Sequence, residues 1–400
     1  MSDVLLRGGL IWGRAEPADL LIRDGRIARV LPSDQPPPPG EVIDLTGQLL
    51  LPGLVEAHCH LDKTLYGGPW VPHSADDTLP GRIANDLARR GPLGVPSVER
   101  ISALLRTMRG YGTAHVRTHT DIDPEVGLRG VEAVAEAAEA TGMSVQQVAF
   151  PQHGVLVNPG TAELLEEALK NGVAAIGGLD PAGVDRDPVR HLDLVFGLAD
   201  RYGALLDLHL HDGGSLGAWE LELIAERTRA LGLGGRVAVS HAYALGQIEP
   251  DHQDRLARLL AEADVALVTA AVYSFPVPPL KRVLAAGVTV ACGHDGIRDL
   301  WGPYGSGDML DRAMHLAYRS AFRRDEDIEL ALRAATYGGA RVLGLSGYGL
   351  AEGDRADLVA VPASCAAEAV VTRPPRTLVM HAGRTVIHSP VVKSGSVLHN

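Results

Sequence analysis

The chain has 400 residues, of which 46% are apolar, so it can bury a large core and form one large domain beside a smaller one. Its formal net charge is -12 without a long basic run, which argues against nucleic acid as a partner. No apolar run reaches about 18 residues, and the N-terminal pattern does not predict a signal peptide. The three sparse cysteines (Cys59, Cys292 and Cys365) predict free thiols in a cytoplasmic protein.

Both ends of the chain are predicted to form short strands with tight turns. Residues 4–9 and 20–27 alternate in polarity and turn at glycine, and Pro36 to Pro39 predict a stiff exposed loop. Residues 356–361 and 377–387 have the same strand-like character. Because neither end can bury a core alone, we expect 1–52 and 348–400 to pack together as one small β-sandwich domain.

Between these ends, apolar strand-like runs alternate with helical runs. The expected helices include 130–141, 161–171, 187–202 and 218–231. Eight strands that alternate with helices predict an α/β fold, a (β/α)8 TIM barrel over 53–347. A doubly wound sheet would also alternate, but it needs no eighth strand and the chain lacks its Gly-rich phosphate loop. The expected strands are 52–60, 113–120, 145–150, 173–179, 204–210, 235–241, 264–269 and 288–293.

Polar residues stand at nearly every strand end, where the chemistry of such a barrel lies. His58 and His60 follow the first apolar run, and because strand side chains alternate, both point the same way. The later strands end in His119, Gln152, Asp180, His209 with His211, His241 and Asp295.

These residues predict a metal centre. His58, His60 and His209 supply three imidazoles and Asp295 a carboxylate, a donor set that suits one Zn²⁺ or Fe²⁺ ion. A water on the ion would be acidified, so that hydroxide attacks an sp² carbon. His241 would orient that hydroxide or polarise the substrate oxygen, and Asp295 could accept the proton of the water.

The combination of motifs resembles the amidohydrolase superfamily, and within it the cytosine deaminase branch, which includes N-isopropylammelide amidohydrolases. The resemblance covers essentially the whole chain. It implies a mononuclear site with His58, His60, His209 and Asp295 as ligands, and a substrate ring bound by the amide of Gln152. Two-metal relatives carry a lysine at the end of strand 4, which this chain lacks. The motifs that carry the resemblance are Gly53–Lys63, His115–His119, Phe150–Gln152, Asp207–His209, Ser240–His241, Gly293–Asp295 and Asp299–Leu310.

Two departures from the cytosine deaminase pattern bear on the substrate. Asp212 stands where those enzymes carry a proton-shuttling glutamate, and Gly296 where a second aspartate contacts the leaving amino group. Both changes affect the recognition of cytosine, so we expect another cyclic amide, ureide, guanidine or N-substituted heterocycle. Lys63 is expected either to bind a substrate oxygen or to form a salt bridge, and Trp301 either to line the pocket or to pack in the core.

The sequence therefore predicts a metal-dependent hydrolase of C–N bonds in cyclic nitrogen compounds, by deamination or ring opening. Asp212 would protonate the ring or the leaving nitrogen, and it could instead cap the following helix; His211 is an alternative shuttle or ligand. His119 and Asp121 are expected to support the ligands. Two other functions stay open: an inactive scaffold on this fold, and a two-metal hydrolase of the dihydropyrimidinase type. A homo-oligomer is compatible with the sequence.

Overall fold

The computed structural model describes residues 3–33, 40–75 and 78–389, so the predicted loop Pro36 to Pro39 lies outside the described residues. By its internal contacts the chain divides into two compact units. The small unit comprises Met1–Leu54, Gly110–Ala114 and Ser346–Asn400, and the large unit comprises Val55–Arg109 and His115–Leu345. The division at 52/53 and 347/348 expected above stays a proposal.

The small unit is built from strands of both chain ends, as predicted. Its sheet runs in the order β16-β15-β14-β5-β1-β2-β3, and β4 pairs with β1. The short helix α12 (Ala366–Thr372) lies between β14 and β15 in the sequence. The strands are β1 (Val4–Ile11), β2 (Ala18–Arg23), β3 (Arg26–Pro32), β4 (Glu41–Asp44), β5 (Leu49–Pro52), β14 (Leu358–Val361), β15 (Leu378–His381) and β16 (Arg384–His388).

Gly8 allows β1 to join the two parts of this sheet. The register of β1 against β2 shifts between Leu6 and Gly9, and Gly8 lies at a φ of 69°. A side chain there would meet the hydroxyl of Thr46 at 2.9 Å. The first half of β1 pairs with β4 and the second half with β5. A glycine bulge thus lets one strand serve both parts.

The large unit is a (β/α)8 barrel, as predicted. Its eight strands are hydrogen-bonded in the order β13-β12-β11-β10-β9-β8-β7-β6, and the pairings from β7 to β13 are parallel. The expected first strand is broken at Gly53, where a side chain would meet Ala114 and Asp357. The strands are β6 (Leu54–Cys59), β7 (Thr113–Asp121), β8 (Ser144–Phe150), β9 (Ala175–Leu179), β10 (Leu205–Leu210), β11 (Val237–His241), β12 (Val265–Thr269) and β13 (Val290–Cys292).

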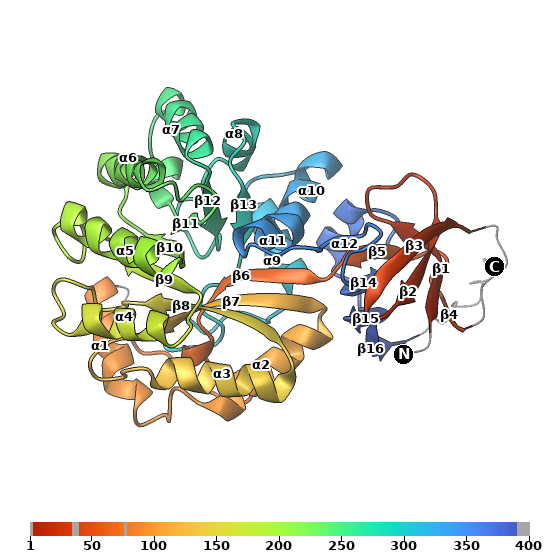
Figure 1. Cartoon of the computed structure of the whole chain (residues 1–400), viewed down its shortest axis with the longest axis horizontal. Helices are drawn as coiled ribbons and strands as arrows, with labels where there is room; N and C mark the ends of the chain where they lie inside the picture. Colours follow the sequence, from red (N-terminus) through yellow and green to blue (C-terminus); the bar gives the residue numbers. More distant parts are fainter. Residues whose placement is uncertain (1–2, 34–39, 76–77, 390–400) are drawn as a thin grey trace, which may run out of the picture. The chain divides into compact units, whose positions relative to one another are not determined.

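Helices surround these strands (Figure 1). Apolar residues of α2 and α3, among them Leu104, Leu105 and Val134, pack with Val116 of β7 and close one side of the barrel. None of the described helices is long and apolar enough to cross a membrane. The helices are η1 (Leu61–Lys63), α1 (Leu79–Arg90), α2 (Val98–Gly110), α3 (Arg129–Thr141), α4 (Thr161–Lys170), α5 (Pro188–Tyr202), α6 (Gly214–Ala230), η2 (Tyr243–Gly246), α7 (Pro250–Glu262), α8 (Leu280–Ala285), α9 (Met309–Arg319), α10 (Asp325–Arg333), η3 (Ala334–Gly338) and α11 (Gly339–Val342).

The barrel closes between its first and last strands next to the predicted metal ligands. The backbone N–H of Asp295 donates a 2.9 Å hydrogen bond to the carbonyl of His58, and Cys59 and Asp295 form a parallel bridge. At Gly293 any side chain would meet the backbone of His58. A glycine is therefore needed where the two chain segments approach, and the closure brings Asp295 beside His58 of β6 and His60, which follows the strand.

Candidate metal centre

The two histidines at the end of β6 are buried and oriented by hydrogen bonds through Nδ1. His58 Nδ1 lies 2.8 Å from Ser240 Oγ, and His60 Nδ1 lies 3.0 Å from the carbonyl oxygen of His119. Because a carbonyl only accepts, the Nδ1 of His60 carries the proton and its Nε2 keeps a lone pair. Ser240 Oγ donates its hydrogen to Asp207, so it accepts a hydrogen bond from Nδ1 of His58. The Nε2 of His58 therefore also keeps a lone pair. Both rings thus present Nε2 as a ligand atom.

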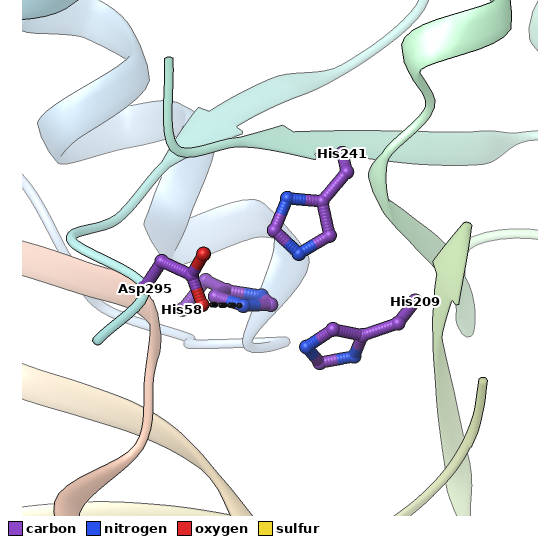
Figure 2. A group of neighbouring side chains, drawn as sticks. All are labelled: His58, His209, His241 and Asp295. Atoms are coloured by element: carbon purple, nitrogen blue, oxygen red, sulfur yellow. Dashed lines mark ion pairs between the residues drawn. The ribbon is translucent and has the colours of Figure 1, made fainter. Parts of the chain in front are cut away.

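Side chains from three other strand ends converge on these two nitrogens. His209 belongs to β10, His241 ends β11 and Asp295 follows β13 (Figure 2). Asp295 Oδ1 lies 3.6 Å from His58 Nε2 and 3.2 Å from His60 Nε2. One ligand atom each from His58, His209, His241 and Asp295 lies within 4.8 Å of the others. His60 adjoins this group, since its Nε2 is 3.4 Å from His209 Nε2.

The charge states of this cluster suit a metal ion. Burial lowers the pKa of His60, His209 and His241, so their rings are neutral near pH 7. Burial alone would raise the pKa of Asp295, but the adjacent side chains of His58 and His60 outweigh it and hold that pKa well below its usual range. The cluster therefore combines neutral imidazoles with a carboxylate, the protonation states that metal binding requires.

Unpartnered atoms and backbone strain also fit a metal ion here. Nε2 of His58 and Nε2 of His241 are buried without a hydrogen-bond partner among the described residues. An unpaired buried polar atom is costly, and a cation would satisfy these nitrogens. His241 and Asp295 have φ values of 70° and 66°, which are strained for residues other than glycine and are typical of functional sites. The nitrogen and oxygen donors match Zn²⁺ and Fe²⁺.

A chain of buried polar groups supports His58 from behind. Ser240 Oγ donates a 2.7 Å hydrogen bond to Asp207 Oδ1, and Arg117 donates to Asp207 Oδ2 at 2.9 Å. Ser240 and Asp207 lie within the motifs that carry the family resemblance, but the sequence alone predicts no role for either. Asp207 precedes His209 by two residues, so strand alternation could have placed both on the inner face.

His119 lies behind the cluster, where a supporting role was expected. Its ring is fully buried, 4.3 Å from the ring of His58 and 4.4 Å from that of His209. His58, His119 and Asp207 form a second group whose ligand atoms lie within 4.8 Å of one another. This second group shares His58 with the first, and its carboxylate already accepts hydrogen bonds from Arg117 and Ser240.

A cavity of about 1030 Å³ opens in front of the cluster. Six of the predicted metal-ligand and substrate-binding residues line its inner end together with Phe150, which stacks on His209 at 4.1 Å. Gly296 also lines it, and a side chain at that position would meet the carboxylate of Asp299. The lining at the inner end comprises His60, Lys63, Phe150, Gln152, His209, His211, Asp295, Gly296, Asp299 and Trp301.

Lys63 is held in place by several groups and lines the cavity. Its Nζ donates a 2.6 Å hydrogen bond to Gln152 Oε1 and lies 2.9 Å from Asp121 Oδ1. It also lies 5.4 Å from the centre of the Trp301 ring. Burial would lower the pKa of Lys63, but Asp121 and neighbouring carboxylates raise it above its ordinary value, so the ammonium stays charged. The two expected environments of Lys63, a salt bridge and a place in the pocket, therefore occur together.

Asp212 is not among the residues that line the cavity. Its Oδ2 accepts a 2.8 Å hydrogen bond from the N–H of Gly183, and its carboxyl also contacts Glu220. His211 lines the cavity instead, and its Nδ1 lies 2.9 Å from Asp180 Oδ2. Burial would lower the pKa of His211, but Asp180 raises it overall. His211 shares strand parity with His209, a signal already present in the sequence.

A barrel with imidazoles and a carboxylate at the ends of its strands defines the class of metal-dependent barrel hydrolases. Residues 96–388 match the model of the amidohydrolase family. The chain belongs to this family and is an enzyme that hydrolyses carbon–nitrogen bonds other than peptide bonds.

Individual relatives cover nearly the whole chain. N-isopropylammelide isopropyl amidohydrolase of Pseudomonas sp. (strain ADP) is 31% identical over 397 residues, 98% of each chain. The crystal structure of N-isopropylammelide isopropylaminohydrolase from Burkholderia multivorans ATCC 17616 is 45% identical, with a TM-score of 0.93 over 97% of this chain and 99% of that one. A 5-methylcytosine deaminase from Klebsiella pneumoniae, liganded with 5-fluorocytosine, is 27% identical, with a TM-score of 0.86 over 97% and 98%.

Proposed function

We propose that this protein is a mononuclear metal-dependent hydrolase of small nitrogen heterocycles and that it releases an exocyclic amine from an oxygen-bearing ring. The observation that carries the proposal is the convergence of four histidines and Asp295, of which His60, His209 and Asp295 line the inner end of one cavity. The names of the relatives, an N-isopropylammelide hydrolase and a 5-methylcytosine deaminase, support this substrate class.

In this proposal His58, His60, His209 and Asp295 hold one divalent ion, Zn²⁺ or Fe²⁺. When bound, such an ion supplies a water nucleophile at neutral pH and polarises the substrate carbon. A single ion is favoured because β9 ends in Leu179 without a lysine and because Asp207, in the second donor group, is already paired with Arg117.

The remaining groups bind the substrate and carry protons. His241, with its unpartnered Nε2, would accept a hydrogen bond from the attacking water or contact the developing oxyanion. Asp295 is the carboxylate nearest the ligand nitrogens and would accept the proton of that water. The proton-carrying role of Asp212 stays a prediction, since its carboxylate faces Gly183.

The hydrogen bond from Lys63 determines which atom of the Gln152 amide is free to contact the substrate. Because the ammonium donates to Oε1 of the amide, the Nε2 of Gln152 is the group left to donate to a ligand. A ring that presents a carbonyl oxygen to Gln152 and Lys63 would therefore bind better than one that presents an amino group. This preference favours a ring that presents an oxygen over the amidine edge of cytosine. It agrees with Gly296, which stands where the cytosine deaminase pattern has an aspartate that contacts the leaving amino group.

Two competing functions make different predictions for the bound metal. An inactive scaffold would bind none, whereas a two-metal hydrolase would hold about two ions per chain, with His119 in the second site. The presence of all the predicted donor atoms argues against the scaffold. Cytoplasmic location and self-association stay predictions.

The proposal is tested by metal analysis together with hydrolysis of N-isopropylammelide, cytosine, isocytosine and cyclic ureides. We expect about one ion per chain and release of an amine from the ammelide. His58→Ala should lose both the ion and the activity. His252→Ala, a change on α7 outside the cavity, is the control and should keep both. Full activity in the metal-free protein would refute the metal-dependent mechanism.

A further inference from the structure

A row of aromatic side chains leads from the proposed catalytic His241 to the opening of the cavity. The ring of Tyr243 lies 5.4 Å from that of His241, and Phe275 stacks on Tyr243 at 5.1 Å with 12° between the planes. Tyr273 lies 6.3 Å from Phe275, and Tyr304 lies 6.0 Å from Tyr273. All four line the cavity. We call Tyr243, Phe275, Tyr273 and Tyr304 the aromatic wall.

The exposure of the wall increases outward. Tyr243 is 8% exposed, Phe275 37%, Tyr273 49% and Tyr304 69%. Large apolar side chains left open in a row beside a cleft mark a surface that a ligand covers. The wall lines the same cavity as His209 and Asp295, so its occupant would be part of a molecule that also reaches these predicted metal ligands.

The wall is held rigidly rather than hanging on a free loop. Arg312 donates a 2.7 Å hydrogen bond to the carbonyl of Ala270, and Arg319 donates to the carbonyl of Phe275 at 2.6 Å. Gly302 leaves room for the hydroxyl of Tyr273, which any side chain at that position would meet. The segment after β12 is thereby fixed at both ends, so the rings of Tyr273 and Phe275 offer a pre-formed surface, which lowers the entropic cost of binding.

The volume of the cavity also indicates a ligand larger than a single ring. A volume of about 1030 Å³ is at the upper end of the range for drug-sized ligands, and a single substituted ring at the inner end fills only part of it. Two of the cationic side chains that line the cavity, Arg319 and the buried Arg312, donate guanidinium hydrogen bonds to backbone carbonyls. The wall therefore offers ring faces and edges, which suit an uncharged planar group.

We propose that the aromatic wall is a second subsite, which binds a planar apolar substituent attached to the ring that reacts at the metal centre. This inference rests on the proposed function, since it requires a nitrogen heterocycle at the inner end. It extends that function by making the natural substrate a heterocycle with an aryl or arylalkyl group rather than a short alkyl group.

The test compares three probes that share one ring: N-isopropylammelide, N-benzylammelide and N-(cyclohexylmethyl)ammelide. Their dissociation constants and kcat/KM values are measured on the metal-loaded enzyme. We expect the benzyl probe to bind at least about fivefold more tightly than either of the others, because aromatic pairs add to apolar burial. Equal affinity of the benzyl and cyclohexylmethyl probes would overturn the planar subsite.

Substitutions in the aromatic wall test whether these residues cause the preference for the benzyl probe. Tyr273→Ala and Tyr304→Ala should each lower the ratio of benzyl to cyclohexylmethyl affinity toward one, and Tyr304→Ala changes an exposed residue that folding does not need. Tyr318→Ala removes an 81% exposed tyrosine of α9 outside the cavity and should leave the ratio unchanged. A ratio that persists in both wall variants refutes the subsite. Turnover of N-isopropylammelide without any benzyl preference refutes the subsite alone, whereas failure of all three probes to bind refutes the proposed function and this extension with it.

Discussion

Ser240 Oγ lies 2.8 Å from Nδ1 of His58 and 2.7 Å from Asp207 Oδ1, so one buried hydroxyl links a predicted metal ligand to a carboxylate in the barrel. The serine oxygen accepts a hydrogen bond from the Nδ1–H of His58, and its hydroxyl donates a hydrogen bond to Asp207. This arrangement fixes both the ring orientation of His58 and the tautomer that leaves Nε2 free to bind a cation.

Ser240→Ala should therefore weaken metal binding by about 10- to 100-fold, the range seen when the hydrogen-bond partner of a ligand histidine is lost. Competition with a chelator measures the affinity. Ser144→Ala is a matched control, because Ser144 Oγ lies 3.0 Å from the Nδ1 of His115, away from the cluster. Equal metal affinity in the two variants would contradict the role of Ser240.

Lys63→Met should destabilise the fold and also impair substrate binding. The change leaves Asp121 buried without its cation, which typically costs about 3–5 kcal/mol of unfolding free energy. Lys281→Met removes a pair with Asp327 near the surface and should cost less than about 1 kcal/mol. Urea unfolding of both variants decides this prediction, which fails if the two losses are alike.

The stability of the protein should fall as the pH rises toward 8, in part because of Glu220. Burial, with the neighbouring Asp212, raises the pKa of Glu220 to about 8, so the folded state keeps a proton that the unfolded chain releases near pH 4.5. Between these values the folded state binds more protons, so the stabilisation is present below about pH 4.5 and is lost as the pH passes 8.

Glu220→Gln should flatten this part of the stability profile. The amide keeps an acceptor for the N–H of Ala182, which donates to Glu220 at 2.8 Å, and it no longer titrates. For one proton the slope difference is at most about 1.4 kcal/mol per pH unit. Thermal or urea unfolding between pH 5 and 8 measures it, and parallel profiles of wild type and variant would show that Glu220 does not hold the proton.

Asp212→Asn should lower kcat by less than about tenfold. Loss of a general acid or base typically costs 10²–10⁴-fold, but the Asp212 carboxylate accepts from Gly183 and is absent from the cavity lining. Asp295→Asn is the comparison and should lose nearly all activity together with the metal. A loss of more than about 100-fold in Asp212→Asn with normal metal content would instead support the predicted proton-carrying role.

The barrel and the convergence of the ligands could be predicted because they follow from short-range rules. Strand alternation puts His58 and His60 on one face, and the parallel arrangement puts all strand ends at one edge. The same alternation applied to His209 indicates Asp207 and His211 as well. Asp212 is different, because it follows the end of β10, where the chain no longer alternates and its direction depends on contacts with Gly183 and Glu220.

The sequence by itself determined the eight-stranded barrel, the small β domain built from both chain ends and the amidohydrolase family, and it predicted a set of metal ligands, because these depend on local periodicity and on motifs. Only the tertiary structure decided that the ammonium of Lys63 donates to the side-chain oxygen of Gln152 and that Ser240 accepts a hydrogen bond from His58. It also decided that four aromatic rings follow one another along the cavity. These contacts join residues that are up to 182 positions apart. Their geometry depends on how loops and side chains pack across the barrel, which no local pattern encodes.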